Sequence, residues 1–316
     1  MATRSKQRRP PKTAKGRSVQ HPKKQDARKG LSRWPIAAVA LVLVAAAIGI
    51  TLTRGGNDVA SRGEATAGLP NTPDYHSLLV DPTDANALLL GTHQGLYRSA
   101  DGGITWGFEG LSGQDAMNLA RPSNSVVWAA GHEVLAKSTD GGETWQDVHP
   151  DGLPGRDVHG FTVDSRDQQV LYAAIAGQGL FRSRNGGRSF SLLSHEVGPA
   201  VMALATMRDG RILAGDMQQG LMVSRDGTSW SRALEAQVMG LAVNPSAPKV
   251  VLASGRGIVR STDGGRTWKQ AFELPDGTGP VAWAASAPNV AYVVGFNRVL
   301  YKTTDAGVSW QPVEGR

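Results

Sequence analysis

The sequence predicts an all-β chain, organised as a single β-propeller of six four-stranded blades that is preceded by one transmembrane helix. A phrase with the pattern Ser/Thr-x-Asp-Gly-Gly-x-Thr-Trp occurs six times with small departures, and its starts lie about 37 to 45 residues apart, a period typical of propeller blades. The runs between the phrases are short, apolar or β-branched, and bounded by Gly, Pro, Asp and Asn, as strands are. The uncharged run 34–53 is long enough to cross a bilayer.

Each of the six phrases, called boxes below, is expected to form the turn between the third and fourth strands of its blade. Aspartate tolerates the left-handed backbone region and binds nearby N–H groups, glycine supplies positive φ, and the final aromatic residue anchors the turn. The boxes are Ser99–Trp106, Ser138–Trp145, Ser183–Phe190, Ser224–Trp230, Ser261–Trp268 and Thr303–Trp310. The residues at the acid position are predicted to be structural: Asp101, Asp140, Asn185, Asp226, Asp263 and Asp305.

The chain before the repeats divides into three segments. Residues 1–33 carry 12 Lys or Arg against one acid and are expected to form a disordered basic tail in the cytoplasm. Residues 34–53 are the predicted transmembrane helix, since an uncleaved anchor suits a long basic tail better than the alternative, a signal peptide processed near residues 45–47. Residues 54–74 are the predicted flexible linker, and residues 75–316 are the propeller, placed outside the cytoplasmic membrane.

Composition excludes several classes of site. The chain has no cysteine, which excludes disulfide partners, thiolate metal sites and a lipoprotein anchor. Of the net charge of +7, the tail contributes +11 (12 minus 1), so the remainder carries −4. The basic character therefore belongs to the tail, and the propeller is not expected to bind nucleic acid. Because the repeats run from an inner strand to an outer strand, the ring is expected to close by face-to-face packing of the first and last blades.

The histidines depart from the repeat. His76 and His159 begin inner strands, and His93 and His132 lie in loops between second and third strands, so all four are expected at the channel mouth away from the boxes. Equivalent loops hold other residues: Gln178, Gln218 and Arg256. Neutral imidazole is the commonest metal ligand, and zinc or copper suits histidines without thiolates. The four are therefore candidate ligands of a metal or another small ligand, with ordinary hydrogen-bonding histidines at loop ends as the alternative.

Two acids are the best candidates for catalysis. A glycoside hydrolase needs two carboxylates about 5 to 9.5 Å apart. Asp157 and Asp216 are expected on the same face as the histidines, with Asp115 and Glu133 behind them, and solvated loop acids are the alternative interpretation. The sequence therefore favours a protein without catalytic activity, and names glycoside hydrolysis as the reaction to test.

The boxes resemble the Asp-box, or BNR repeat, of sialidase-like propellers, sortilin-type luminal domains and photosystem-assembly propellers. Over residues 75–316 the chain also looks like small bacterial membrane-anchored or secreted BNR propellers, often labelled glycosyl hydrolase or exo-alpha-sialidase-like. The segments that carry this resemblance are His76–Pro82, Gly91–Leu96, Ala130–His132 and Asp157–Phe161. The resemblance implies that the boxes lie on the rim away from the ligand face. The glycosidase label rests on fold analogy, which does not license a reaction.

These observations favour a membrane-anchored, extracytoplasmic propeller that serves as a binding platform. Its histidine-bearing face is expected to engage a metal ion, a protein or a glycan. One alternative is a glycoside hydrolase that acts on cell-envelope or extracellular glycans. The other is a membrane-protein assembly factor, by analogy with the photosystem propellers.

Overall fold

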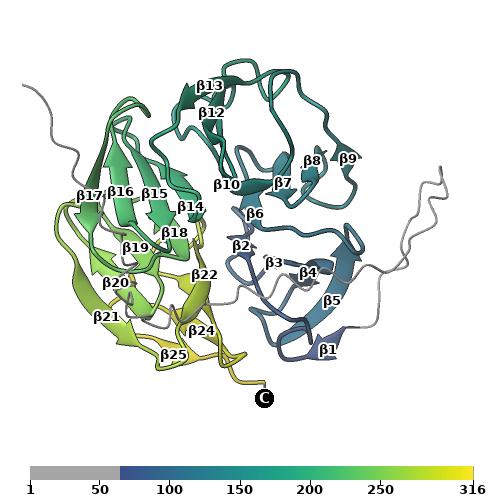
Figure 1. Ribbon diagram of the computed structural model, residues 1–316. Helices are drawn as coiled ribbons and strands as arrows, with labels where there is room; N and C mark the ends of the chain where they lie inside the picture. The colour runs from purple at the N-terminus through teal and green to yellow at the C-terminus, as the bar shows by residue number, and fades with distance from the viewer. Residues whose placement is uncertain (1–64, 316) are drawn as a thin grey trace, which may run out of the picture. The chain divides into compact units, whose positions relative to one another are not determined.

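The computed structural model describes residues 65–315, which lie in one compact unit. The predicted basic tail, the predicted transmembrane helix and most of the predicted linker lie outside the described residues. Within residues 65–315 there is no helix that is long and apolar enough to cross a membrane. The described chain forms separate antiparallel sheets, arranged around a central channel (Figure 1).

In the first three blades, four strands follow one another in chain order from the channel outward. Blade one contains β2 (Ser77–Val80), β3 (Leu88–Thr92), β4 (Gly95–Ser99) and β5 (Thr105–Gly110). Blade two contains β6 (Asn118–Ala120), β7 (Val127–Gly131), β8 (Val134–Ser138) and β9 (Gln146–Asp147). Blade three contains β10 (Val158–Val163), β11 (Leu171–Ile175), β12 (Gly179–Ser183) and β13 (Ser191–Ser194).

The last three blades repeat the arrangement. Blade four contains β14 (Val201–Thr206), β15 (Ile212–Asp216), β16 (Gly220–Ser224) and β17 (Trp230–Leu234). Blade five contains β18 (Gly240–Val243), β19 (Val251–Ser254), β20 (Gly257–Ser261) and β21 (Lys269–Glu273). Blade six contains β22 (Thr278–Trp283), β23 (Ala291–Gly295), β24 (Leu300–Thr303) and β25 (Gln311–Pro312). The predicted propeller of six four-stranded blades is therefore confirmed.

The second strand of each blade is buried along its length, as β3, β7 and β11 illustrate. These strands read as continuous apolar runs without polar alternation, because neighbouring blades cover both faces of each sheet. Burial of apolar surface stabilises by roughly 25 cal/mol per Å². The blade-to-blade interfaces therefore hold the ring together.

The ring closes where blade six meets blade one. The inner strands β22 and β2 are in contact, and one apolar cluster joins Leu78 and Leu90 of blade one to Tyr292 and Leu300 of blade six. The Tyr292 hydroxyl also donates a hydrogen bond to the carbonyl of Ala85 at 3.0 Å. The closure thus rests on packed faces, as expected from the order of the strands.

The end of the predicted linker belongs to the propeller. β1 (Thr66–Ala67) pairs antiparallel with β5 and adds a fifth strand to the outer edge of blade one. Tyr75 is 4 % exposed, and its hydroxyl donates a hydrogen bond to the carbonyl of Pro70 at 2.7 Å. Residues 65–74 are therefore packed against the first blade, which corrects the predicted boundary at residue 74. A two-residue strand carries too little sequence pattern to be recognised before its partner is known.

The boxes close through one recurring set of hydrogen bonds. In the first box the Ser99 hydroxyl donates to Asp101 Oδ1 at 2.8 Å and accepts from the Gly103 N–H at 2.8 Å. The Thr105 N–H and hydroxyl donate to the two oxygens of Asp101 at 2.9 and 2.6 Å. Trp106 Nε1–H donates to the carbonyl of Gly103 at 3.0 Å. These bonds give the acid a structural task at the turn.

Acid is expected to destabilise the propeller through the boxes. The Thr144 hydroxyl and N–H hold the pKa of Asp140 well below its ordinary value of 3.8, and Thr267 and Ser309 do the same for Asp263 and Asp305. A carboxyl group with a lowered folded-state pKa stabilises the fold above about pH 4, and this contribution is lost as the pH falls through the folded-state value. We expect the midpoint of urea unfolding to begin to drop near about pH 5 and to go on dropping well below about pH 3.

The matched control is the triple variant Asp140→Asn, Asp263→Asn and Asp305→Asn. Asparagine already occupies the equivalent position at Asn185, where the hydrogen bonds of the turn still form. The triple variant is expected to show a flatter dependence on pH. An equally steep loss in the triple variant would assign the acid sensitivity to other groups.

Candidate functional site

The central channel opens at two mouths. At the end where the inner strands begin lies a cavity of about 70 Å³, whose lining includes four long side chains of the residues at this end, and we call this end the histidine mouth. The four are His76, Met117, Met202 and Met239. At the end where the inner strands stop lies a larger cavity of about 550 Å³, which we call the opposite mouth.

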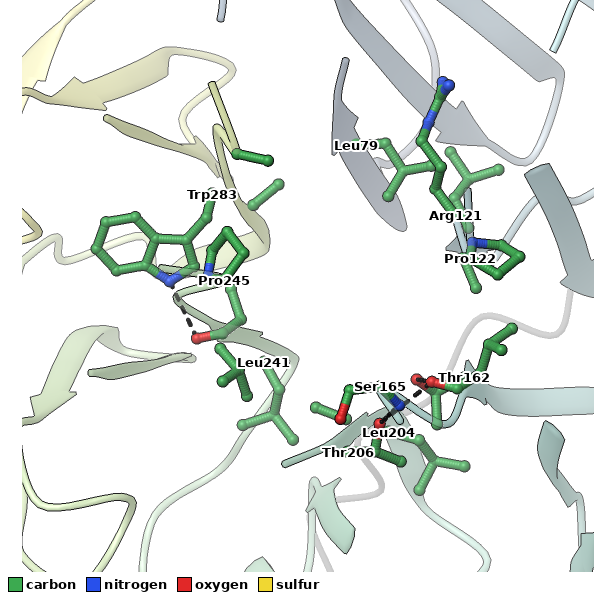
Figure 2. A pocket seen from close by; sticks show the side chains of 18 of the residues that line it. Leu79, Arg121, Pro122, Thr162, Ser165, Leu204, Thr206, Leu241, Pro245 and Trp283 are labelled. Carbon is green, nitrogen blue, oxygen red and sulfur yellow. Dashed lines mark hydrogen bonds between the residues drawn. The ribbon is translucent and has the colours of Figure 1, made fainter. Parts of the chain in front are cut away.

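The opposite mouth is lined by apolar side chains and by charged ones, among them Arg121 (Figure 2), Asp164 and Arg166. Hydrogen bonds join neighbouring blades there. Trp283 Nε1–H donates to the carbonyl of Ala242 at 3.2 Å, which joins blades five and six. The Ser165 N–H donates to the Thr206 hydroxyl oxygen at 2.9 Å, which joins blades three and four. Within residues 65–315, the groups of metal-ligating atoms within 4.8 Å of one another are formed by residues of the first three blades. The candidate site is therefore the histidine mouth.

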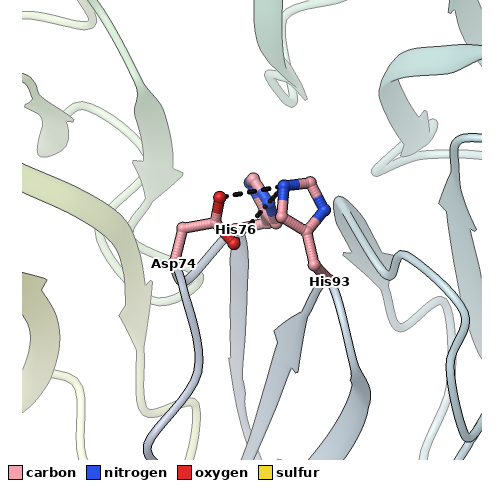
Figure 3. Close-up of side chains that lie close together, drawn as sticks. All are labelled: Asp74, His76 and His93. Carbon is pink, nitrogen blue, oxygen red and sulfur yellow. Dashed lines mark hydrogen bonds and ion pairs between the residues drawn. The ribbon is translucent and has the colours of Figure 1, made fainter. Parts of the chain in front are cut away.

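The first group, called the first triad, consists of Asp74, His76 and His93 (Figure 3). Asp74 and His76 immediately precede β2, and His93 lies in the turn between β3 and β4. Nε2 of His76 lies 3.1 Å from Asp74 Oδ1, and Nε2 of His93 lies 2.9 Å from Asp74 Oδ2. The two Nε2 atoms are 3.2 Å apart. The two imidazole nitrogens thus lie close to each other, and each lies near a different oxygen of Asp74.

The turn between β3 and β4 fixes the place of His93. The Thr92 hydroxyl donates to the carbonyl of Gly95 at 3.0 Å and accepts from the Gln94 N–H at 3.0 Å. Gly95 has φ of 120°, and a Cβ there would lie 2.6 Å from the carbonyl oxygen of Leu111, so only glycine fits. The histidine is therefore presented on a turn that is bonded at both ends.

The second triad consists of His132, Asp157 and His159. His132 lies in the turn between β7 and β8, and Asp157 precedes β10, in which His159 is the second residue. Nδ1 of His132 lies 2.5 Å from Asp157 Oδ1, and Nε2 of His159 lies 3.2 Å from the same oxygen. Burial lowers the pKa of His159, which favours the neutral imidazole that binds metals.

Asp115 lies between the two triads. Its side chain is 10 % exposed, and its Oδ2 lies 2.8 Å from Nδ1 of His93 and 3.7 Å from Nε2 of His132. Two glycines let the Asp115 loop approach: a Cβ at Gly131 would lie 1.9 Å from the Asp115 carbonyl oxygen, and one at Gly91 would lie 2.3 Å from that of Ala116. Each histidine next to Asp115 turns its other ring nitrogen toward its own triad.

The carboxylates dominate the electrostatics of the first triad. Hydrogen bonds from His93 to Asp115 and Asp74 raise the pKa of His93 to about 10, against the effect of burial. Burial alone would raise the pKa of Asp74, but hydrogen bonds from His76 and His93 hold it below its ordinary value. At neutral pH Asp74 is therefore an anion, and His93 carries a proton that a metal ion bound at its Nε2 would displace.

All four predicted histidines thus meet at one mouth, and Asp157 joins them. Asp74 was missed, although a sequence signal existed: the first three inner strands are preceded by Asp-x-His, Asp-x-Met and Asp-x-His. These repeats begin at Asp74, Asp115 and Asp157. An acid two residues before the mouth position is therefore a property of the first half of the ring, and it could have been found from the repeat alignment.

The two candidate catalytic acids have different environments. Asp216 is 0 % exposed, and its Oδ1 accepts hydrogen bonds from the N–H groups of Gln218 and Gln219, both at 2.7 Å. It closes the turn after β15 within its own blade. Asp157 is engaged with the two histidines of the second triad. An acid without exposed surface cannot reach a glycosidic oxygen, so this geometry gives the pair no support as a general acid and base.

Comparison with known sequences gives two kinds of relative. A family model described as photosynthesis system II assembly factor YCF48 matches residues 75–312. A xyloglucanase from Paenibacillus sp is 26% identical over 192 residues, which are 58% of this chain and 18% of that protein. A xyloglucanase from Hypocrea jecorina (strain QM6a) is 26% identical over 215 residues, which are 65% of this chain and 25% of that protein. The chain thus spans a quarter or less of the length of these curated relatives.

Solved structures share the fold at low sequence identity. The structure described as YCF48 bound to D1 peptide has a TM-score of 0.52 and 18% identity, and the match covers 79% of this chain and 83% of that chain. The xyloglucanase of family GH74 from Xanthomonas campestris has a TM-score of 0.56 and 18% identity, and covers 79% of this chain and 46% of that chain. The family model covers nearly the whole propeller, and this chain belongs to the family of photosynthesis system II assembly factor YCF48.

Proposed function

We propose that the protein is a membrane-anchored, extracytoplasmic binding platform that holds a transition-metal ion, zinc or copper, at the histidine mouth. The observation that supports this is the geometry of the first triad: the two Nε2 atoms are 3.2 Å apart, and they lie 3.1 and 2.9 Å from the two oxygens of Asp74. Ligand atoms at 2.0–2.1 Å from a tetrahedral zinc ion lie about 3.3 Å from one another. The two histidine nitrogens already have about this separation, and a zinc ion bound to both of them and to one oxygen of Asp74 would keep its fourth position open.

Asp115 supplies the support that a metal-binding histidine requires. Such a histidine generally donates its second ring N–H to a carboxylate or carbonyl, which fixes the tautomer. In His93 the Nε2 atom faces the first triad while Nδ1 lies 2.8 Å from Asp115. Both oxygens of Asp115 are buried, and Oδ2 faces a histidine of each triad. This oxygen is suited to accept hydrogen bonds from the ring N–H groups of these two histidines.

The second triad offers a similar donor set. It combines two imidazoles and one carboxylate whose ligand atoms lie within 4.8 Å of one another. Its His132 turns Nε2 toward Asp115 and Nδ1 toward Asp157.

The test is a zinc titration of the full chain, purified in detergent and stripped of metal with a chelator. The wild-type protein is expected to bind zinc, and the double variant His76→Ala and His93→Ala to lose binding at the first triad. The matched control is His149→Ala, because His149 forms an exposed pair with Asp147 at 2.9 Å and belongs to neither triad. Equal zinc uptake by the wild type and the double variant would refute the proposal.

Binding of a protein segment is the second candidate function. Membership of the YCF48 family supports it, since one structure in that group is described as bound to D1 peptide. On this alternative the protein is a membrane-protein assembly factor whose partner docks on the propeller. A full chain that takes up neither zinc nor copper would favour a protein segment as the occupant of the histidine mouth. The xyloglucanase relatives support glycan binding less, because the candidate acid pair is not arranged for hydrolysis.

A further inference from the structure

Strand register places one residue from each blade at the same level of the channel. In blades one to five, the box serine pairs with the first residue of the second strand. Three residues further along that second strand lies a residue that pairs with a residue of the inner strand. We call the residue that directly precedes this inner-strand partner in the sequence the mouth position. The five residues at this position, called the mouth layer, are His76, Met117, His159, Met202 and Met239.

The mouth layer differs in chemistry from the layer below it. Two residues further along each inner strand, the channel is filled by ordinary apolar side chains: Leu78, Leu119, Phe161, Leu204, Leu241 and, in blade six, Val281. Leucine thus serves where apolar filling is the only requirement. In the mouth layer every described position of blades one to five carries imidazole or thioether instead. Blade six, whose inner strand is irregular between Thr278 and Val281, does not continue the series.

Four of these side chains share one small space. His76 and the three methionines line the cavity of about 70 Å³ together with the apolar residues of the layer below, whereas His159 does not line it. Met117 is 5 % exposed, and Met202 and Met239 are partly buried. Methionine is unbranched and adapts its side chain readily, so several sulfur atoms can turn toward one point in such a cavity.

Thioether ligands select a soft cation. Imidazole and carboxylate bind zinc and copper alike, whereas thioether sulfur favours copper(I) among the metals common in proteins. We propose that the mouth layer is a copper(I) site, in which the thioethers of the methionines and the imidazole of His76 are the ligands. The inference rests on the proposed function in taking the histidine mouth as the metal-binding end of the channel. It adds the thioethers as a second kind of donor, in a site that shares His76 with the first triad.

The experiment separates the two donor sets by the metal that each one binds. The full chain in detergent is titrated anaerobically with copper(I) against the competing chelator bicinchoninate, and separately with zinc. In the double variant Met202→Leu and Met239→Leu, leucine keeps the volume and apolar character of the cavity while removing two sulfur atoms. The matched control is Met222→Leu, which removes a partly buried thioether of blade four that does not line the mouth.

We expect wild type and control to bind copper(I) with the same affinity, and X-ray absorption at the copper edge to show sulfur neighbours. The double variant is expected to lose more than the roughly 10- to 100-fold in affinity that removal of an outer-shell partner costs, because the thioethers would be direct ligands. Its zinc affinity is expected to stay at the wild-type value, since the triads contain no methionine.

Two results would overturn the inference and leave the proposed function standing. One is zinc binding by a chain that takes up no copper(I), and the other is equal copper(I) affinity in the wild type and the double variant. A chain that binds copper(I) through sulfur but takes up no zinc would support the mouth layer and argue against zinc in the triads. Failure of both metals would refute the proposed function together with this inference.

Discussion

Replacing Trp106 with alanine is expected to lower the free energy of unfolding by about 3–5 kcal/mol, the usual cost of removing a large aromatic side chain from a core. Trp106 is 1 % exposed, and it belongs to the apolar cluster that joins blade one to blade six at the closure of the ring. Its Nε1–H is bonded to the carbonyl of Gly103. The substitution therefore leaves a cavity, an unsatisfied carbonyl and a weakened closure at one place.

Urea unfolding followed by circular dichroism measures the effect. The matched control is Trp268→Ala in the box of blade five, where the indole makes the same bond to its turn at 3.2 Å but is only partly buried. We expect a clearly smaller loss for Trp268→Ala, because less apolar surface returns to water. Equal losses would mean that the bond to the turn, and not burial at the closure, sets the contribution of these residues.

Replacing Asp115 with asparagine is expected to weaken zinc binding at both triads by about 10- to 100-fold. Asparagine keeps the shape of the side chain but loses the charge that holds His93 and His132 in the tautomers with a free ligand nitrogen. The distance of 3.7 Å to His132 is about 0.5 Å beyond hydrogen-bond length, so a small adjustment of the ring is part of this expectation.

Zinc titrations in two single-site backgrounds separate the triads. With His159→Ala only the first triad remains, and with His76→Ala only the second, and Asp115→Asn is expected to lower the affinity in each. Nitrogen NMR of the zinc-bound wild type is expected to show His93 protonated at Nδ1, and loss of that tautomer preference in Asp115→Asn. An effect confined to one background would mean that Asp115 serves a single triad.

The fold could be read from the sequence because its determinants are local. Each box forms its hydrogen bonds within about eight residues, as Ser99, Asp101 and Thr105 do. The residues that contact one another are therefore neighbours in the sequence as well. The spacing of the boxes then leaves room for four short strands per blade, and the structure has four. The predicted membrane anchor depends on residues 34–53, which lie outside the described residues, and it stays a prediction.

The candidate site could be predicted only in part from the sequence, because its contacts join residues of different blades. His93 and His132 were singled out as departures from the repeat, but Asp115 belongs to the site through its position between two neighbouring turns. Asp74 fell in the predicted linker, where no strand pattern flagged it. Asp216 shows the opposite case. The sequence predicts it as a candidate catalytic acid, but in the assembled blade it has no exposed surface.

The small strand β1 has a mechanical consequence. Thr66 and Ala67 pair with the outermost strand of blade one. A force that pulls on the chain ahead of residue 65 therefore acts on this pairing before it acts on the other strands of the propeller. A pull along the chain there would open two residue pairs and then work against the buried Tyr75 and its bond to Pro70. The attachment is thus expected to break in steps under a pulling force. The two pairs of β1 open first, and the pull reaches Asp74 of the first triad, which directly precedes Tyr75, only after them.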